Sequence, residues 1–107
     1  MTVSQLCRAC GFETANLAQD REATGVYCCD LLSLVMGRAP AGSAWFTVMG
    51  NLNAVAVASL ADVACIVLCE GVPMDAPGLQ KAREQGINVL RTPLPVFEAA
   101  SQVKALL

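Results

Sequence analysis

Six cysteines, nine acidic residues and seven basic residues carry the chemically versatile groups of this 107-residue chain, which contains no histidine. Without histidine, one copy of the chain cannot form a Ser-His-Asp or Cys-His relay or bind zinc through an imidazole. The carboxylates that could form a catalytic pair are Asp20, Asp30 and Glu70, and no spacing in the sequence brings two of them together. We therefore expect no catalytic activity.

The cysteine spacing leaves several interpretations open. The Cys7–Cys10 and Cys28–Cys29 pairs could combine into a four-thiolate site for zinc or an iron–sulfur cluster, and the first pair could instead be a redox motif. Against both, Cys7–Cys10 falls within a predicted helix that precedes the first strand, whereas a thioredoxin-like motif follows a strand. Cys65 and Cys69 fall on one face of a predicted buried strand, where free cysteine behaves as a small hydrophobic residue. We expect reduced structural thiols, with no metal and no cofactor.

Polar residues near the ends of predicted strands are the candidates for binding a ligand. In open α/β sheets, ligands collect beyond the carboxyl ends of the strands, where helix N-termini present free N–H groups. Gly50 and Asn51 lie at such an end, where glycine allows close approach of the backbone and asparagine both donates and accepts hydrogen bonds. Arg21 could hold a phosphate or carboxylate in its fork. The candidate set is Asp20, Arg21, Thr24, Gly25, Cys29, Asp30, Gly50, Asn51 and Asn53.

These candidates also have structural interpretations. Asn51 could simply cap the helix that follows it. Asp20 and Arg21 could satisfy the backbone of a turn and pair with each other. The chain has neither a Walker-type sequence nor a G-x-G-x-x-G sequence, so a phosphate site would depend only on the general geometry of strand ends.

Charge and hydropathy exclude other classes of partner. The net charge of −2, the scattered basic residues and the low aromatic content of 5% argue against a nucleic-acid interface. Residues 39–61 carry no charge and are long enough to span a bilayer. However, Pro40, Gly42, Gly50 and Asn51 divide this window into a strand, a turn and a helix, as in a parallel sheet covered on both faces. We expect no membrane span, and a cytoplasmic location because the N-terminus lacks a signal sequence.

The elements that must position these residues alternate between strand and helix along the chain. The patterns predict helices over residues 3–10, 30–36, 52–60, 75–85 and 96–106, and strands over 12–17, 23–28, 45–49, 65–69 and 87–90. Strands separated by helices of about ten residues indicate right-handed βαβ units. We expect one small α/β domain over residues 1–107, with a mainly parallel sheet of four to five strands flanked by helices.

Several blocks of the sequence, taken together, resemble one known family. The segment Asp20–Ser33, which reads Asp-Arg-Glu-Ala-Thr-Gly-Val-Tyr-Cys-Cys-Asp-Leu-Leu-Ser, resembles the signature of the DRTGG domain family. Trp45–Val48 and Asn53–Ala58 resemble the second block of its short stand-alone members. The similarity continues through Lys81–Ile87 and Phe97–Glu98, so it covers nearly the entire chain.

The chain departs from the family pattern at three places. Val26 stands where the motif has its second glycine, Cys29 replaces a serine, and Met49–Asn51 stands where the family often has a Gln-Thr-His run. The resemblance implies a fold similar to the N-terminal domain of HPr kinase/phosphorylase. It also implies a regulatory or dimer-forming role, as DRTGG domains have between CBS domains in certain inorganic pyrophosphatases.

Two functions follow as expectations. The first is a non-enzymatic regulatory or assembly module that forms a homodimer, because one small domain with 55% hydrophobic residues cannot easily hide them all. The alternative is a sensor of a nucleotide or phosphorylated metabolite, with Gly50–Asn51, Cys29–Asp30 and Arg21 as the contacts. A module built on thiol-bound metal is a third hypothesis.

Overall fold

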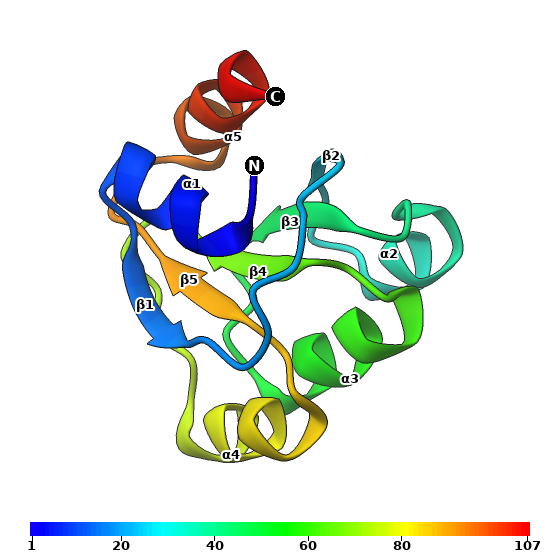
Figure 1. Cartoon of the computed structure of the whole chain (residues 1–107). Helices are drawn as coiled ribbons and strands as arrows, with labels where there is room; N and C mark the ends of the chain where they lie inside the picture. The colour runs from blue at the N-terminus through cyan, green and yellow to red at the C-terminus, as the bar shows by residue number, and fades with distance from the viewer.

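The computed structural model describes residues 1–107, and its elements follow the order that the sequence predicts (Figure 1). The helices are α1 (Val3–Cys10), α2 (Leu32–Arg38), α3 (Leu52–Ala61), α4 (Ala76–Gln85) and α5 (Val96–Leu106). The strands are β1 (Glu13–Asn16), β2 (Gly25–Cys28), β3 (Ser43–Thr47), β4 (Cys65–Leu68) and β5 (Val89–Arg91).

The five strands form one sheet in the order β1-β5-β4-β3-β2. Strands β2 to β5 are parallel neighbours in chain order. β1 pairs with β5 antiparallel, with an irregular register between Thr14 and Asn16. The prediction of a mainly parallel sheet with a short edge strand near residues 12–17 is confirmed.

The connections between strands decide how the helices are layered. Each strand from β2 to β5 lies on the same side of the strand before it, so right-handed crossovers place α2, α3 and α4 on one face. α1 and α5, from the two ends of the chain, cover the other face (Figure 1). The parallel strands therefore wind in a single direction, and the sheet lacks the reversal of strand order that opens a ligand crevice in doubly wound sheets.

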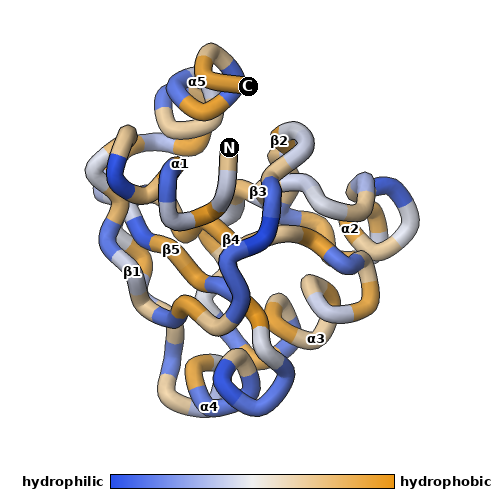
Figure 2. Tube along the Cα trace, in the orientation of Figure 1, coloured by the Kyte–Doolittle hydropathy of each residue, from blue (hydrophilic) through white to orange (hydrophobic).

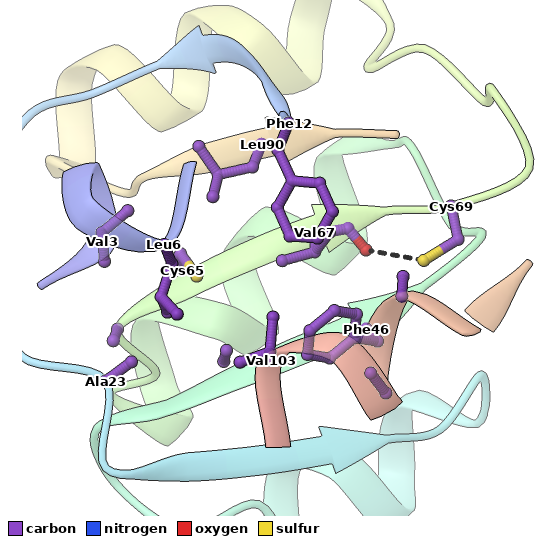
Figure 3. Close-up of a cluster of buried hydrophobic side chains, with 14 residues drawn as sticks. Val3, Leu6, Phe12, Ala23, Phe46, Cys65, Val67, Cys69, Leu90 and Val103 are labelled. Carbon is purple, nitrogen blue, oxygen red and sulfur yellow. Dashed lines mark hydrogen bonds between the residues drawn. The ribbon is translucent and has the colours of Figure 1, made fainter. Parts of the chain in front are cut away.

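Two hydrophobic clusters fill the spaces above and below the sheet. Neighbouring residues of a strand point to opposite faces, so Phe46 and Val67 belong to the cluster under α1 and α5 (Figure 3). Trp45 and Ile66 belong to the cluster under α2, α3 and α4. All four side chains are fully buried. This burial on both faces explains the continuous apolar sequence of the central strand β4, which Figure 2 shows in orange.

Local capping defines most of the helix ends. Thr2 and Gln5 form a complete capping box at the start of α1, and Gly11 ends this helix in a left-handed conformation with φ of 70°. The side chains of Asn51 and Asp75 accept hydrogen bonds from backbone N–H groups in the first turns of α3 and α4. These ends lie within one residue of their predicted positions because their signals are short-range. The second helix, predicted over residues 30–36, instead lies over Leu32–Arg38 and continues through Gly37, and no side-chain cap marks its start.

The third strand lies two residues earlier than predicted, over Ser43–Thr47 in place of 45–49. Its ladder with β4 begins at Ala44 and ends at Thr47. The next backbone N–H, that of Val48, donates to the Asp30 carboxylate and not to a carbonyl of a neighbouring strand. The uncharged window is thus divided into β3, a turn and α3. None of the helices is long and apolar enough to cross a membrane.

Candidate functional site

The structure divides the nine predicted site residues between opposite ends of the sheet. Asp20, Arg21, Thr24 and Gly25 lie before or at the amino end of β2. The remaining five, Cys29, Asp30, Gly50, Asn51 and Asn53, follow the carboxyl ends of β2 and β3. A strand rises by about 3.3 Å per residue, so the length of β2 separates the two groups. Arg21 therefore does not accompany Asp30 and Gly50 in a common site.

Asp20 anchors the N-terminal end of α1. Its carboxylate accepts hydrogen bonds from the backbone N–H of Ser4 at 2.8 Å and from the Ser4 hydroxyl at 2.5 Å. These bonds favour the ionised form and lower the pKa of Asp20 below its ordinary value. A carboxylate at a helix N-terminus is also favoured by the helix dipole. Asp20 thus joins the loop before β2 to the first helix.

Arg21 binds the turn between α3 and β4. Its Nη1 donates to the Asp62 carboxylate at 2.9 Å and to the Val63 carbonyl at 3.0 Å, and its Nη2 donates to the Asp62 carbonyl at 3.3 Å. Asp62 ends α3 in the left-handed region, with φ of 57°, where a residue other than glycine is uncommon. The predicted pairing of Asp20 with Arg21 is wrong, because each residue binds a different segment.

Thr24 and Gly25 complete this end of the motif. The Thr24 backbone N–H donates to the Gly42 carbonyl at 2.9 Å, and the Thr24 side chain lies against Gly42, whose φ is 81°. A side chain at Gly25 would meet open space. Val26, where the family motif has a second glycine, is extended and pairs with Ala44 in the sheet. Position 26 therefore does not require glycine.

At the carboxyl end, Asp30 connects β2 to β3. Its Oδ1 accepts a hydrogen bond from the Thr47 hydroxyl at 2.6 Å and another from the Val48 backbone N–H at 3.0 Å. The carbonyl of Cys29 accepts a bond from the Trp45 indole N–H at 2.9 Å. Both residues thereby fix the chain that leaves the sheet.

Gly50 is approached by the chain's own backbone. A Cβ at this position would collide with the Pro73 carbonyl oxygen, and the Gly50 carbonyl accepts a hydrogen bond from the Asp75 N–H at 3.0 Å. The neighbouring Asn51 caps α3, while Asn53 is exposed on the first turn of this helix. Gly50 does allow close approach of another group, as predicted, but that group is the backbone of the loop before α4.

The cysteines are all free thiols. Cys65 and Cys69 are fully buried on the α1/α5 face, which confirms their predicted common face. Burial raises the pKa of each of these thiols to about 12, and the Cys69 thiol donates to the Val67 carbonyl (Figure 3). Both are inert core groups by these criteria.

The Cys7–Cys10 pair lies in α1, as predicted. The Cys7 thiol donates to the Phe12 carbonyl at 2.8 Å, and burial together with the neighbouring Cys7 raises the pKa of Cys10. No group of three or more cysteine or carboxylate side chains is placed to hold a metal ion.

Two hollows in the surface were missed by reasoning from sequence. The larger one, which we call the α5–β2 groove, has a volume of about 700 Å³ and is mostly apolar. It lies between Val26 and Cys28 of β2 and Phe97, Ala100, Ser101 and Lys104 of α5. No local sequence signal could have located it, because its two walls are about 70 residues apart and meet only through tertiary packing.

The smaller one, which we call the Arg91 hollow, has a volume of about 300 Å³ and is lined by no hydrophobic residue. Gly11, Glu13, Gly71, Arg91, Thr92 and Pro93 surround it. Arg91 donates to the Gly71 carbonyl at 2.8 Å and forms a long ion pair of 3.5 Å with Glu13. None of the nine predicted site residues lines either hollow.

Comparison with known proteins finds similarity at the level of the fold. No family model matches the sequence, and no curated protein matches it. Among solved structures, the chain is similar to the CBS and DRTGG domains of the regulatory region of Clostridium perfringens pyrophosphatase, complexed with the activator diadenosine tetraphosphate. The TM-score is 0.78 at 14% sequence identity, over 97% of this chain and 46% of that chain. The chain thus spans about half of that regulatory region, and it has the DRTGG-like α/β fold that its sequence predicts.

Proposed function

We propose that this chain is a non-enzymatic regulatory module that acts as a homodimer. The observation that carries the proposal is an exposed apolar surface on one side of the molecule, at the α5–β2 groove. Phe97, on α5, is 77% exposed although it lines this groove. Contiguous apolar surface of this kind on a small domain is typical of a protein–protein contact.

The polar residues of the family motif support a structural use of the motif. Asp20 anchors α1, Arg21 holds the α3–β4 turn and Asp30 ties β2 to β3. Each of these side chains already has charge-assisted partners within the chain. A ligand would have to displace these internal partners before it could bind the same side chains.

Fold similarity supports the regulatory part of the proposal. The similar region of the Clostridium perfringens pyrophosphatase is regulatory. A regulatory module transmits a signal by contacts with other domains or subunits, and the exposed apolar groove is suited to such contacts.

Sedimentation equilibrium tests the homodimer directly. The 11.2 kDa chain should sediment with twice its own mass at micromolar concentrations. A monomer that persists at about 100 μM would exclude any dimer with a dissociation constant in the micromolar range and would overturn this proposal.

A sensor of a nucleotide or phosphorylated metabolite is the second candidate, and the Arg91 hollow favours it. The hollow is polar and holds a guanidinium whose ion pair with Glu13 is long, so a phosphate could replace that carboxylate. The hollow lies at the carboxyl end of β5. Asp30 and Gly50 lie at the same end of the sheet, but they follow β2 and β3. The similar pyrophosphatase region was solved with diadenosine tetraphosphate.

Thermal denaturation with ATP, diadenosine tetraphosphate and acetyl phosphate tests the sensor. A ligand present at 100 times its dissociation constant stabilises the folded state by about 2.7 kcal/mol. The shift should disappear in Arg91→Gln and persist in Arg83→Gln, which changes an exposed arginine of α4. The absence of any shift with all three compounds, or equal shifts in both variants, would contradict binding in the Arg91 hollow.

A further inference from the structure

The two edges of the sheet differ in how they are protected. β1 has the sequence Glu-Thr-Ala-Asn, carries the exposed carboxylate of Glu13 and has an irregular register. Charges and bulges of this kind prevent an edge strand from pairing with another chain. β2, with the sequence Gly-Val-Tyr-Cys, carries no charge and keeps a regular register with β3 over its four residues. The β2 edge has none of these protective devices.

Apolar side chains lie on both sides of the β2 edge. On one face, α5 packs over β2, and the α5–β2 groove lies between them. On the other face, α2 exposes Leu34 and Met36, of which Met36 is 50% exposed. Three layers, formed by α5, β2 and α2, therefore meet at this edge of the sheet, where β2 has unpaired backbone and α5 has apolar side chains beside it.

We propose that a second copy of this chain pairs with this side, with β2 antiparallel to β2 of the partner across a two-fold axis perpendicular to the sheet. This inference rests on the proposed homodimer and names its surface. The two five-stranded sheets would become one continuous sheet of ten strands. The same axis brings α5 against α5 and α2 against α2, so each layer meets its own copy, as an isologous interface requires.

The area that a stable dimer needs supports the use of all three layers. A standard interface removes about 800 Å² from each partner, which is roughly one-sixth of the 5139 Å² exposed by the chain. The molecule measures 30 × 25 × 24 Å along its principal axes. An interface of that size must occupy most of one side, and a single strand or a single helix is too small.

The charges of α5 are complementary to a second copy of α5. Glu98 lies near the start of this helix and Lys104 near its end, and both are exposed. Antiparallel packing centred near Ser101 places each Lys104 level with the partner's Glu98, so opposite charges face each other twice. Ala100 and Ser101, at the centre, are small enough for the two helices to approach closely.

Matched surface variants test this interface. Phe97→Asp alters a side chain that is 77% exposed, and Leu60→Asp is the control because Leu60 is 73% exposed on α3, which lies between α2 and α4. Neither change affects the monomer core. Phe97→Asp should raise the dissociation constant by roughly 100-fold or more, the effect of losing a central aromatic contact, and Leu60→Asp should leave it unchanged. The backbone amides of β2 that point away from β3 should exchange slowly with deuterium in the wild-type dimer and rapidly in Phe97→Asp, whereas those bonded to β3 should be protected in both.

Charge reversal provides a second, independent measurement. Lys104→Glu places two glutamates opposite each other and should raise the dissociation constant roughly tenfold at low salt. The double variant Glu98→Lys/Lys104→Glu should restore wild-type association. Failure of this rescue would overturn the antiparallel arrangement.

The outcomes separate this inference from the proposed function. A wild-type dimer that persists in Phe97→Asp, dissociates equally in Leu60→Asp, or leaves the outward-pointing amides of β2 unprotected would overturn the β2 interface while the homodimer stands. A wild-type chain that remains monomeric would overturn both, and β2 would then be open to a different partner.

Discussion

Replacing Arg21 distinguishes a structural motif from a ligand-binding one. Arg21→Ala removes three hydrogen bonds to the turn at Asp62 and Val63, which lies more than 40 residues further along the chain. The ion pair itself is largely exposed on the Asp62 side, and exposed pairs contribute about 0.2–1 kcal/mol. The bonds to the two carbonyls add about 1.5 kcal/mol, because they are charge-assisted but partly solvated. We expect a loss of about 2 kcal/mol in the free energy of unfolding.

Urea denaturation followed by circular dichroism measures this loss, with three variants as a series. Arg21→Lys keeps the charge but not the planar fork, so it should lose about 1 kcal/mol. Asp62→Asn keeps a residue that tolerates the left-handed conformation and removes only the charge, so it should lose about 0.5 kcal/mol. For a domain of this size, the Arg21→Ala variant should also melt roughly 10 °C lower than the wild type.

A double-mutant cycle shows whether Arg21 acts through Asp62. In the Asp62→Asn background, Arg21→Ala should lose less than in the wild type, by about 0.5–1 kcal/mol. If Arg21→Ala destabilises the chain by less than about 0.5 kcal/mol but abolishes a thermal shift with a phosphorylated compound, Arg21 is a ligand contact and the structural interpretation is refuted.

Three further substitutions test other parts of the structure. Gly50→Ala should lower the free energy of unfolding by about 3 kcal/mol, because the new Cβ meets the backbone of the loop before α4. The matched variant Gly25→Ala should change it by less than about 0.5 kcal/mol, because a side chain there meets open space. Equal losses in the two variants would contradict the close approach at Gly50. The pKa values of about 12 at Cys65 and Cys69 are raised above the ordinary value of 9.0, so their stabilising effect is complete below pH 9 and is lost towards pH 12. Between pH 9 and pH 11, the free energy of unfolding from urea titrations should fall by up to about 1.4 kcal/mol per pH unit for each thiol. The Cys65→Ala/Cys69→Ala variant should flatten that slope, and an unchanged slope would exclude these thiols as its cause. The pKa of Asp20 is lowered, so its contribution exists above the ordinary value of 3.8 and disappears as pH falls through the folded value. Asp20→Asn should therefore be less stable than the wild type at pH 7, and this difference should shrink as the pH falls below 3.8. A constant difference down to the lowest pH at which both fold would show that the ionised carboxylate is not the stabilising form.

Four of the five helices and most strands could be predicted because their determinants are local, whereas α2, which has no side-chain cap, was predicted two residues too early. Asn51 and Asp75 bond to backbone only three residues away, and Gly11 and Gly86 end their helices with left-handed backbone. The strand that was misplaced, β3, is the element whose ends are defined by other segments. Its ladder with β4 and the contact between Asp30 and Val48 set its limits, and neither is visible in the spacing of residues 45–49.

The contacts of the candidate site residues could not be predicted in this way, because they are long-range. The sequence correctly marks Arg21, Asp30 and Gly50 as residues with special tasks, because a guanidinium, a carboxylate and a glycine in turns are seldom neutral choices. Their partners, Asp62, Thr47 and the Pro73 carbonyl, are distant in the chain. Sequence spacing could not show that these partners occupy the positions assumed for a ligand.

By itself, the sequence determined the alternation of strands and helices, the burial of both sheet faces and the mainly parallel pairing, because periodicity and capping act over a few residues. Only the tertiary structure decided that the sheet winds in one direction, that Arg21 and Asp30 lie at opposite ends of β2, and that α5 leaves an apolar groove beside an unprotected strand edge. These features arise where segments far apart in the chain come into contact. Local sequence patterns such as periodicity and capping do not show which distant segments pack together.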